Sequence, residues 1–286
     1  MALTVKANAK INLGLRITGR RDDGYHLLHT LYQELDFGDT LTLSEGSSGS
    51  VTLRVTGPAA RGVPAGGDNL CMRAARLLQE RVGTRRGVHV VLKKRVPPES
   101  GLGGGSSDAA AVLRGLNGYW QAGLGEAELT ALAGTLGADV PFFIRGGLQL
   151  GEGEGKLLTP LDKQLAVAVV LVIPPISVET AWAYGQLTGR DSWPAAPAFD
   201  RLVAQTPLPW ERFTNDFEEL VFHRYKGLAE LKRGLLDAGA LHASLAGSGS
   251  AVYGLFDDAQ DLAALGGQFA HSQVVVCKAV HTPSPA

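Results

Sequence analysis

The stretch from Val96 to Asn117, VPPESGLGGGSSDAAAVLRGLN, has the residue types of a phosphate-binding loop. Four glycines and two serines fall within Gly101–Ser107, and an alanine-rich helical run follows directly. Glycine allows positive φ and close backbone approach to a ligand, and helix-start amides with the helix dipole favour an anion. Ser106, Ser107 and Asp108 could each cap the helix. The stretch therefore indicates a polyphosphate site, since a flexible connector would need neither the helix start nor the serine pair.

Two common nucleotide-binding motifs do not match this stretch. The dinucleotide fingerprint GxGxxG fails because, counted from Gly101 and Gly103, Ser106 stands where the third glycine belongs. The Walker pattern fails because no Gly-Lys-Ser or Gly-Lys-Thr ends the loop. The string GLGGGSSDAA instead resembles the phosphate loop of the GHMP small-molecule kinases, the family of galactokinase, homoserine kinase and mevalonate kinase.

Two charged residues stand in patterns with an ordinary structural reading. Lys10 shares a strand face with Asn8 and Asn12, and a strand lysine is usually a solvated side chain. Asp139 follows a helix end in Gly-Ala-Asp-Val-Pro, where a turn or capping residue is expected. Spacing alone therefore gives neither residue a function. The turn GSGS at 247–250 is equally compatible with a plain hairpin turn and with a second set of backbone donors near a ligand.

Other catalytic arrangements have little support. His26 and His29 are three apart but have no cysteine or carboxylate cluster beside them, and on a strand they would face opposite sides. We therefore expect no transition-metal site. No Gly-x-Ser-x-Gly elbow stands out, which argues against a hydrolase triad.

The composition indicates a soluble globular enzyme. Of the 286 residues, 45% are hydrophobic and 19% are charged, and the formal net charge of −1 with no basic block argues against nucleic acid. Cys71 and Cys277 lie far apart, as expected in a reduced compartment. The N-terminal residues lack a secretory h-region. The most apolar run, 165–175, is about half as long as a membrane span. We predict a cytoplasmic protein, monomeric or homodimeric, that binds neither nucleic acid nor membrane.

Strands and helices are mixed along the chain in a pattern that predicts an α+β fold. Asp68 or Asn69 should cap a helix, and a composition shift at 151–155 suggests two domains, 1–155 and 156–286. In the first half, strands are expected over 3–8, 11–17, 26–37, 40–43, 50–57 and 87–94, with helices over 69–83 and 125–136. In the second half, strands are expected over 165–173, 241–246, 251–256 and 274–280, with helices over 178–187, 217–225, 227–238 and 259–269.

Four separated stretches together resemble one branch of the GHMP kinases, the branch that phosphorylates 4-diphosphocytidyl-2-C-methyl-D-erythritol. They are AKINLGLRITGRRDDGYHLLHTL (9–31), PPESGLGGGSSDAA (97–110), GADVPFF (137–143) and AGSGSAVYGLF (246–256). The DGYH segment is absent from GHMP kinases for other alcohols. The resemblance implies the two-domain GHMP fold, with an N-terminal domain like domain 2 of ribosomal protein S5, a ferredoxin-like C-terminal domain and an active site between them.

The resemblance also implies a reaction and its catalytic residues. The γ-phosphoryl group of ATP would move to the 2-hydroxyl of the cytidylated methylerythritol, a step of the non-mevalonate route to isoprenoid precursors. Asp139 would be the base, and Lys10 beside it would orient that carboxylate, keep it ionised and stabilise developing charge. The cofactors would be ATP and Mg²⁺. No magnesium carboxylate is apparent, although Ser106 or Ser107 could supply an oxygen.

The remaining site residues are carried over from the same resemblance. The substrate would be bound by Asn12, Tyr25, His26, Thr180 and Tyr184, with His26 reading the cytosine edge and the tyrosines stacking on its faces. The nucleotide would be bound by Asn69, Lys94, Pro97, Pro98, Glu99, Ser100, Gly101, Leu102, Gly103, Gly104, Gly105, Ser106 and Ser107. This chain departs from the family pattern at Glu99 and Ser100, where some members carry glycines, and a carboxylate there must point away from the triphosphate or meet Mg²⁺.

Three rival functions stay open on the sequence. A GHMP kinase for another alcohol is disfavoured by the DGYH segment and Tyr184. A regulatory protein that kept the fold but lost catalysis is disfavoured because Lys10 and Asp139 are both present. A phosphate-binding module without kinase activity is the third. Acceptor-dependent turnover distinguishes them.

Overall fold

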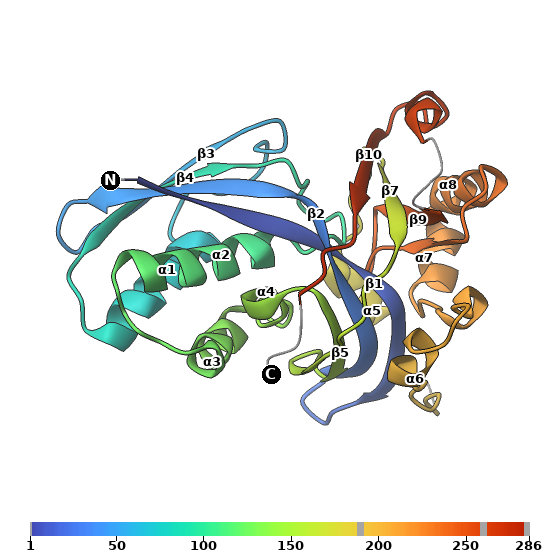
Figure 1. Ribbon diagram of the computed structural model, residues 1–286, viewed down its shortest axis with the longest axis horizontal. Helices are drawn as coiled ribbons and strands as arrows, with labels where there is room; N and C mark the ends of the chain where they lie inside the picture. Colours follow the sequence, from blue (N-terminus) through green and yellow to red (C-terminus); the bar gives the residue numbers. More distant parts are fainter. Residues whose placement is uncertain (1, 188–191, 258–261, 283–286) are drawn as a thin grey trace. The chain divides into compact units, whose positions relative to one another are not determined.

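The computed structural model describes residues 2–187, 192–257 and 262–282, and the chain forms two compact units that share its N-terminal part (Figure 1). Unit 1 contains the residues up to Ala9, Gly38–Pro98 and Gly103–Gly146. Unit 2 contains Lys10–Phe37, Glu99–Leu102 and the chain from Gly147 onward. The domain boundary predicted at Gly155 stays a prediction.

Two long strands, β1 (Ala2–Arg20) and β2 (His26–Gly46), each contribute to both units. The sequence predicted two shorter strands in each of these segments. Gly38 explains why β2 continues through its middle, because a Cβ at this residue would lie 2.3 Å from the carbonyl oxygen of Ala7. The glycine therefore permits a close backbone approach within unit 1 and marks no break in the strand.

A βαβ segment forms the rest of the sheet in unit 1. It consists of β3 (Val51–Thr56), α1 (Leu70–Val82) and β4 (Gly87–Lys93), with β3 and β4 parallel and β4 antiparallel to the end of β2. Asn69 is the N-cap of α1, as predicted, and its side chain accepts a hydrogen bond from the amide of Cys71 at 2.8 Å. These three elements agree with the sequence prediction to within one or two residues.

Three further helices complete unit 1: α2 (Gly104–Tyr119), α3 (Glu126–Leu136) and the short α4 (Phe142–Arg145). Figure 1 shows α1 and α2 side by side against one face of the strands. The alanine run 109–111 on α2 is completely buried, as is Leu43 on β2. The small side chains let the helix approach the sheet closely, which fixes the position of the helix start.

Unit 2 contains two sets of antiparallel strands. The first part of β2 pairs with β5 (Leu148–Gly153), which pairs in turn with β6 (Leu157–Pro160). The other sheet has the order β10-β7-β9-β8, and every neighbouring pair in it is antiparallel. Its strands are β7 (Val167–Ile173), β8 (His242–Leu245), β9 (Val252–Asp257) and β10 (Gln273–Lys278), at the positions predicted from sequence.

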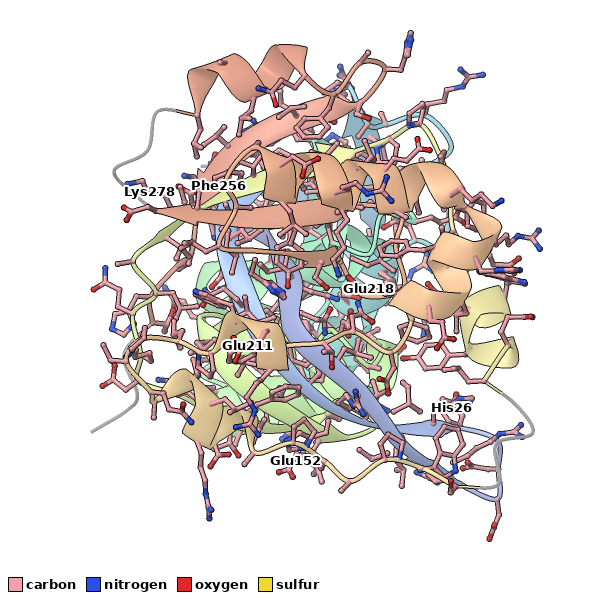
Figure 2. The ribbon with its side chains drawn as sticks, turned by 90° about the vertical axis from the view of Figure 1, so that its right-hand side faces the viewer. His26, Glu152, Glu211, Glu218, Phe256 and Lys278 are labelled. Atoms are coloured by element: carbon pink, nitrogen blue, oxygen red, sulfur yellow. The ribbon has the colours of Figure 1, made fainter. Side chains whose placement is uncertain are left out.

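The helices of unit 2 are α5 (Thr180–Gly185), α6 (Phe199–Val203), α7 (Glu218–Arg224) and α8 (Lys226–Asp237), with 3-10 turns at Trp210–Arg212 and Ala263–Gly267. Helix α8 packs on β8 and β9 of the second sheet. Helix α6 packs instead on the long strands, since its Phe199 lies against Gly14 of β1 and stacks on the ring of His29 of β2. Glu218 ties α7 to the sheet, since its carboxylate accepts hydrogen bonds from the Ser244 hydroxyl and the Leu245 amide (Figure 2). The helix predicted over 178–187 is shorter than expected. The one predicted over 259–269 begins outside the described residues.

None of the helices in the described ranges combines the length and the apolar character needed to cross a membrane.

Candidate active site

Lys10 lies in unit 2 at the head of a hydrogen-bond chain that fixes its ammonium group. The Thr30 hydroxyl donates to the carbonyl of Gly14 at 2.7 Å, so it accepts from the Asn12 amide nitrogen at 2.8 Å. This leaves the Asn12 amide oxygen facing Lys10 Nζ, also at 2.8 Å. The Lys10 side chain is 4% exposed, so it is a buried, directed cation and differs from the solvated strand lysine that spacing alone suggests.

A short piece of the glycine-rich stretch, Glu99–Leu102, belongs to the same unit as Lys10. The carbonyl of Leu102 accepts the Lys10 amide at 3.0 Å. The carbonyl of Ser100 accepts the Ala251 amide at 3.0 Å. Gly101 has φ +77°, and a Cβ there would lie 1.8 Å from the carbonyl oxygen of Ala246. These contacts show why the stretch needs a glycine at this position.

The GSGS turn at 247–250 joins β8 to β9 as a hairpin turn. The alternative that it also supplies backbone donors to a ligand stays a prediction. The amides of Gly249 and Ser250 are both directed to protein carbonyls, at 2.8 and 3.4 Å. A Cβ on Gly247 would lie 3.4 Å from Lys10 Nζ, so the turn passes directly beside the lysine. The Ser248 hydroxyl is 3.1 Å from that of Thr180, the first residue of α5.

Helix α2 of unit 1 begins earlier than the predicted caps require. Its N-cap is Gly103, with φ +72°, and Gly104 is the first helical residue. Ser106, Ser107 and Asp108 therefore lie inside the first turns, and the expectation that one of them caps the helix was wrong. The left-handed glycine redirects the chain without a side-chain cap. The hydroxyl of Ser107 is buried and has no hydrogen-bond partner among the described residues.

The remaining loop residues divide between the two units. Pro97 and Pro98 precede the turn in unit 1, together with Gly103–Ser107 after it. Glu99 is exposed, with φ +55°, so its carboxylate is accessible to solvent. Ser100 beside it is only 3% exposed. The predicted contact of these residues with a triphosphate stays a prediction.

Asp139 lies in unit 1, in the turn between α3 and α4. Its neighbours Val140 and Phe142 are completely buried and anchor the turn, whereas Asp139 itself is half-buried. Lys10 and Asp139 thus belong to different units, and their predicted pairing stays a prediction.

Asn69 and Lys94, the other predicted nucleotide residues, have protein partners in unit 1. The Asn69 side chain accepts from the Cys71 amide and donates to the Pro64 carbonyl. The Lys94 ammonium donates to the carboxylates of Asp39 and Asp108, and its side chain is 3% exposed. Both side chains therefore hold parts of unit 1 together, and their predicted contacts with a nucleotide stay predictions.

Aromatic side chains of unit 2 gather around His26. Its ring lies 5.2 Å from that of Tyr184 and 5.8 Å from that of Trp193, centroid to centroid. Tyr184 in turn meets Phe217 edge to face at 4.9 Å. Burial and the nearby Arg20 cation lower the pKa of His26, and its Nε2 has no partner among the described residues. A neutral imidazole can both donate and accept a hydrogen bond, which suits a base edge.

Tyr25 directly precedes His26 in the chain, and Trp193 is a residue of the cluster that the sequence did not predict. Tyr25, predicted to stack on the base, is 64% exposed and free to do so. Trp193 was missed, because it lies in a Pro/Ala-rich stretch with no helical or strand period to mark it. Only its proximity to His26 identifies it.

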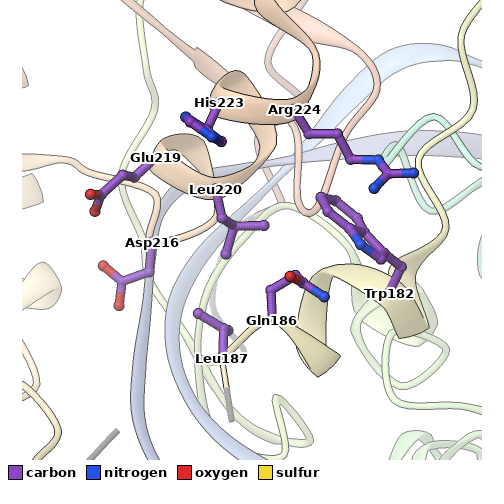
Figure 3. Close-up of a pocket in the computed structure, with 8 residues that line it drawn as sticks. All are labelled: Trp182, Gln186, Leu187, Asp216, Glu219, Leu220, His223 and Arg224. Carbon is purple, nitrogen blue, oxygen red and sulfur yellow. The ribbon is translucent and has the colours of Figure 1, made fainter. Parts of the chain in front are cut away.

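A pocket of about 800 Å³ opens between α5 and α7 (Figure 3). The Arg224 guanidinium lies over the Trp182 ring at 4.7 Å on one side of it. None of the sequence-predicted site residues is among those lining this pocket, which are Trp182, Gln186, Leu187, Asp216, Glu219, Leu220, His223 and Arg224.

Two family models match the chain. The GHMP kinase N-terminal domain matches residues 69–147, which include the glycine-rich stretch and Asp139. The GHMP kinase C-terminal domain matches residues 200–271, which include α7, α8 and the hairpin of β8 and β9.

Curated relatives and solved structures agree with these models. A 4-diphosphocytidyl-2-C-methyl-D-erythritol kinase from Chlorobium phaeovibrioides is 46% identical over 89% of this chain and 88% of its own length. One from Chlorobaculum tepidum is 44% identical over 90% of each. A crystal structure of 4-(cytidine 5'-diphospho)-2C-methyl-D-erythritol kinase has a TM-score of 0.80 and 34% identity, covering 96% of this chain and 99% of that one.

A more distant structure shares the fold alone. Homoserine kinase from Cytophaga hutchinsonii has a TM-score of 0.70 at 17% identity, covering 99% of this chain and 96% of that one. The predicted α+β, two-domain GHMP fold is thereby confirmed. The chain belongs to the GHMP kinase family, in the branch of the 4-diphosphocytidyl-2-C-methyl-D-erythritol kinases.

Proposed function

We propose that this chain transfers the γ-phosphoryl group of ATP to the 2-hydroxyl of 4-diphosphocytidyl-2-C-methyl-D-erythritol. The acceptor comes from the name shared by relatives that match about nine-tenths of the chain. The observation in this structure that supports it is the aromatic cluster of His26, Tyr184 and Trp193. A neutral imidazole with stacking partners suits a cytosine, and neither homoserine nor mevalonate carries a base for it to read.

The turn at Gly103 and the start of α2 would bind the triphosphate. Amides at the first turn of a sixteen-residue helix carry partial positive charge that favours phosphate oxygens. Gly104 and Gly105 add no side chains there, so the backbone itself can approach the phosphates.

Magnesium fits this turn as a companion of the nucleotide. The described residues contain no group of three or more His, Cys, Asp or Glu side chains that could form a metal cage. Mg²⁺ on a nucleotide needs few protein ligands, because phosphates and waters fill most positions. The partnerless hydroxyl of Ser107 is suited to supply one oxygen. When bound, the ion would neutralise charge on the β- and γ-phosphates.

In the reaction, Asp139 would accept the proton of the acceptor hydroxyl. The hydroxyl oxygen then bonds to the γ-phosphorus while the bond to the β–γ bridging oxygen breaks, leaving ADP. Lys10 would stabilise the negative charge on the transferring group, and its hydrogen bond to Asn12 holds the ammonium ready for this. Phosphoryl transfer depends mainly on such positioning and electrostatics.

Acceptor-dependent release of ADP tests the proposal. With Mg-ATP, the cytidylated methylerythritol should support turnover, and homoserine and mevalonate should not. Asp139→Asn should lower kcat by about 10²- to 10⁴-fold, because a general base contributes that much. Asp237→Asn, at the exposed end of α8, is the matched control and should be unaffected.

Turnover with another alcohol would support kinase activity but contradict the proposed cytosine-binding role of His26. ATP binding without turnover on any acceptor would instead favour a regulatory protein.

A further inference from the structure

Three charged side chains are buried together in unit 1, below the start of α2. Lys94 Nζ donates to Asp108 Oδ2 at 2.7 Å and also to Asp39 Oδ2. The three side chains are between 0% and 4% exposed. The second oxygen of Asp39 accepts the backbone amides of Arg95 and Val96. The cluster is therefore linked directly to the backbone that leads into the glycine-rich stretch.

The same cluster also contacts the residues of the glycine-rich stretch that follow the turn, at the start of α2. Gly104 and Asp108 are four residues apart on α2, so they share one face of the helix. A Cβ on Gly104 would lie 3.2 Å from Lys94 Nζ and 2.9 Å from a methyl carbon of Val96. The ammonium group thus lies against the first helical residue. The ammonium of Lys94 therefore contacts side chains or backbone both before and after the glycine-rich turn.

The backbone and side-chain polar groups of Lys94 form hydrogen bonds within the protein. Its amide donates to the Thr56 carbonyl at 2.7 Å, and its own carbonyl accepts the Ala59 amide at 3.2 Å. Its ammonium has two carboxylates and almost no exposure. These two carboxylates already neutralise the ammonium, which leaves it little attraction for a phosphate. The Lys10 ammonium is equally buried but donates to the neutral amide oxygen of Asn12.

The charges of the cluster are not matched one to one. Two carboxylates share one ammonium, and Asp108 Oδ1 has no partner among the described residues. Burial, with the neighbouring Asp39 carboxylate as a smaller cause, raises the pKa of the Asp108 carboxyl to about 7 against the pull of Lys94. One carboxylate would have been enough to pair Lys94. The second carboxylate belongs to Asp108 on α2, so its hydrogen bond with Lys94 attaches that helix to the end of β4.

We propose that Asp39, Lys94 and Asp108 are positioning residues for the phosphate-binding turn. Lys94 fixes Gly104 and the first turn of α2, so that the backbone amides there meet the β- and γ-phosphates of ATP, and its ammonium does not itself bind the nucleotide. This inference rests on the proposed use of the turn for ATP. It replaces the direct contact between Lys94 and the nucleotide that the sequence resemblance suggested.

The test compares phosphorylated and unphosphorylated ligands in calorimetric binding to the full chain. The ligands are ADP, a non-hydrolysable ATP analogue and adenosine. Asp108→Asn keeps the shape of the side chain but removes its charge. Asp39→Asn keeps an oxygen for the amides of Arg95 and Val96 and turns a donor toward the ammonium. Lys94→Met removes the cation, and Glu45→Gln, an exposed residue on β2, is the control.

We expect the two aspartate variants to weaken binding of ADP and the ATP analogue by about ten- to a hundredfold, because a small misplacement of the phosphate contacts has effects of that size. Adenosine binding should change less than about twofold. Glu45→Gln should match the wild type. If Lys94→Met does not fold, the two aspartate variants decide the matter.

Two results would overturn the proposal. Loss of adenosine affinity in proportion to ADP affinity would mean that the cluster only stabilises the fold. Loss of ADP affinity in Lys94→Met with none in either aspartate variant would mean that Lys94 binds phosphate directly. Neither result depends on the acceptor, so a failure of the proposed acceptor specificity would be seen separately, in turnover.

Discussion

At the scale of single residues, Lys10 shows how the environment gives a common side chain its chemical role. The chain of Gly14, Thr30 and Asn12 leaves one amide oxygen for the ammonium, and the ring of Tyr32 lies 5.6 Å away. An ammonium held in this way needs no reorganisation when charge develops in the transition state. Its position is therefore set before any ligand arrives.

Lys10→Met tests this role by removing the charge while keeping the apolar stem. We expect kcat to fall by about 10²- to 10³-fold, the usual effect of losing one electrostatic contact in the transition state. The KM for ATP should change much less. Lys6→Met, an exposed residue of the same strand, is the control and should retain wild-type kcat. An equal effect of both substitutions would contradict the assignment.

Trp193 is a second residue whose effect should be confined to one substrate. Its ring meets the edge of His26, and such aromatic contacts contribute about 0.5–1.5 kcal/mol. Trp193→Ala should therefore raise the KM for the cytidylated acceptor by about three- to tenfold and leave the KM for ATP unchanged, whereas Trp193→Phe should lie near the wild type. Steady-state kinetics with each substrate varied in turn measures both. A rise in the KM for ATP would show a general loss of structure.

His242 predicts a dependence of stability on pH. Burial, with the Lys232 cation as a smaller cause, lowers the pKa of His242 to about 4, and its Nε2 has no partner in the described part of the chain. The unfolded chain has the higher pKa, near 6.5, so it takes up the proton first as the pH falls. The unfolding free energy should thus be highest above about pH 6.5 and fall toward pH 4 by up to about 3 kcal/mol. Urea titrations of the wild type and His242→Gln check this, since the variant should lack that part of the slope.

At the scale of elements, glycines of the nucleotide stretch and of helix α2 differ in what an added methyl group would contact. Gly101 has a left-handed φ and a carbonyl oxygen 1.8 Å from its missing Cβ. Gly118, at the end of α2, has nothing within 4 Å. Gly101→Ala should lower the unfolding free energy by at least about 2 kcal/mol. Gly118→Ala should raise it by up to about 1 kcal/mol, because alanine favours a helix.

Chemical denaturation of both variants, with the KM for ATP, tests that contrast. Gly118→Ala should leave the KM unchanged. If Gly101→Ala were as stable as the wild type, the close approach of Glu99–Leu102 to the 246–251 turn would not be a feature of the folded protein.

Elements were predictable from sequence where a periodic pattern or a punctuating residue marked them. The helix capped by Asn69 and the apolar strand Val167–Ile173 carry such signals, and both were found as predicted. Gly38 was misleading, because glycine marks a turn in one context and a close strand crossing in another. Strand β5 was missed because its Gly-Glu-Gly end resembles a loop. The positions of the loop residues within the site could not be predicted, since they depend on contacts between segments far apart in sequence.

At the scale of the whole molecule, the family and its fold were predictable because four short stretches keep their order and spacing. Sequence order did not reveal that the units are interleaved along the chain. Lys10–Phe37 belongs to unit 2, with residues that follow Gly147. In that unit the carbonyl of Leu15 accepts the Asp216 amide, and the Leu15 amide donates to the Thr214 carbonyl at 2.8 Å. A cut at one point of the chain therefore does not separate the units.

This interleaving predicts that the segment 156–286 will not fold alone, whereas 1–155 contains all of unit 1. Without residues 1–155, the core of unit 2 loses Leu15, Ile17 and Leu28, which are at most 8% exposed in it. The Asp216 carboxylate also loses the Ile17 amide, which donates to it at 2.8 Å. Losing part of a core in this way removes much of the small net stability of a domain. A purified 156–286 fragment should thus melt without a cooperative transition by circular dichroism. The same fragment co-expressed with 1–155 should form a complex that melts cooperatively, and a sharp, reversible melt of 156–286 alone would show that its fold does not depend on these contacts.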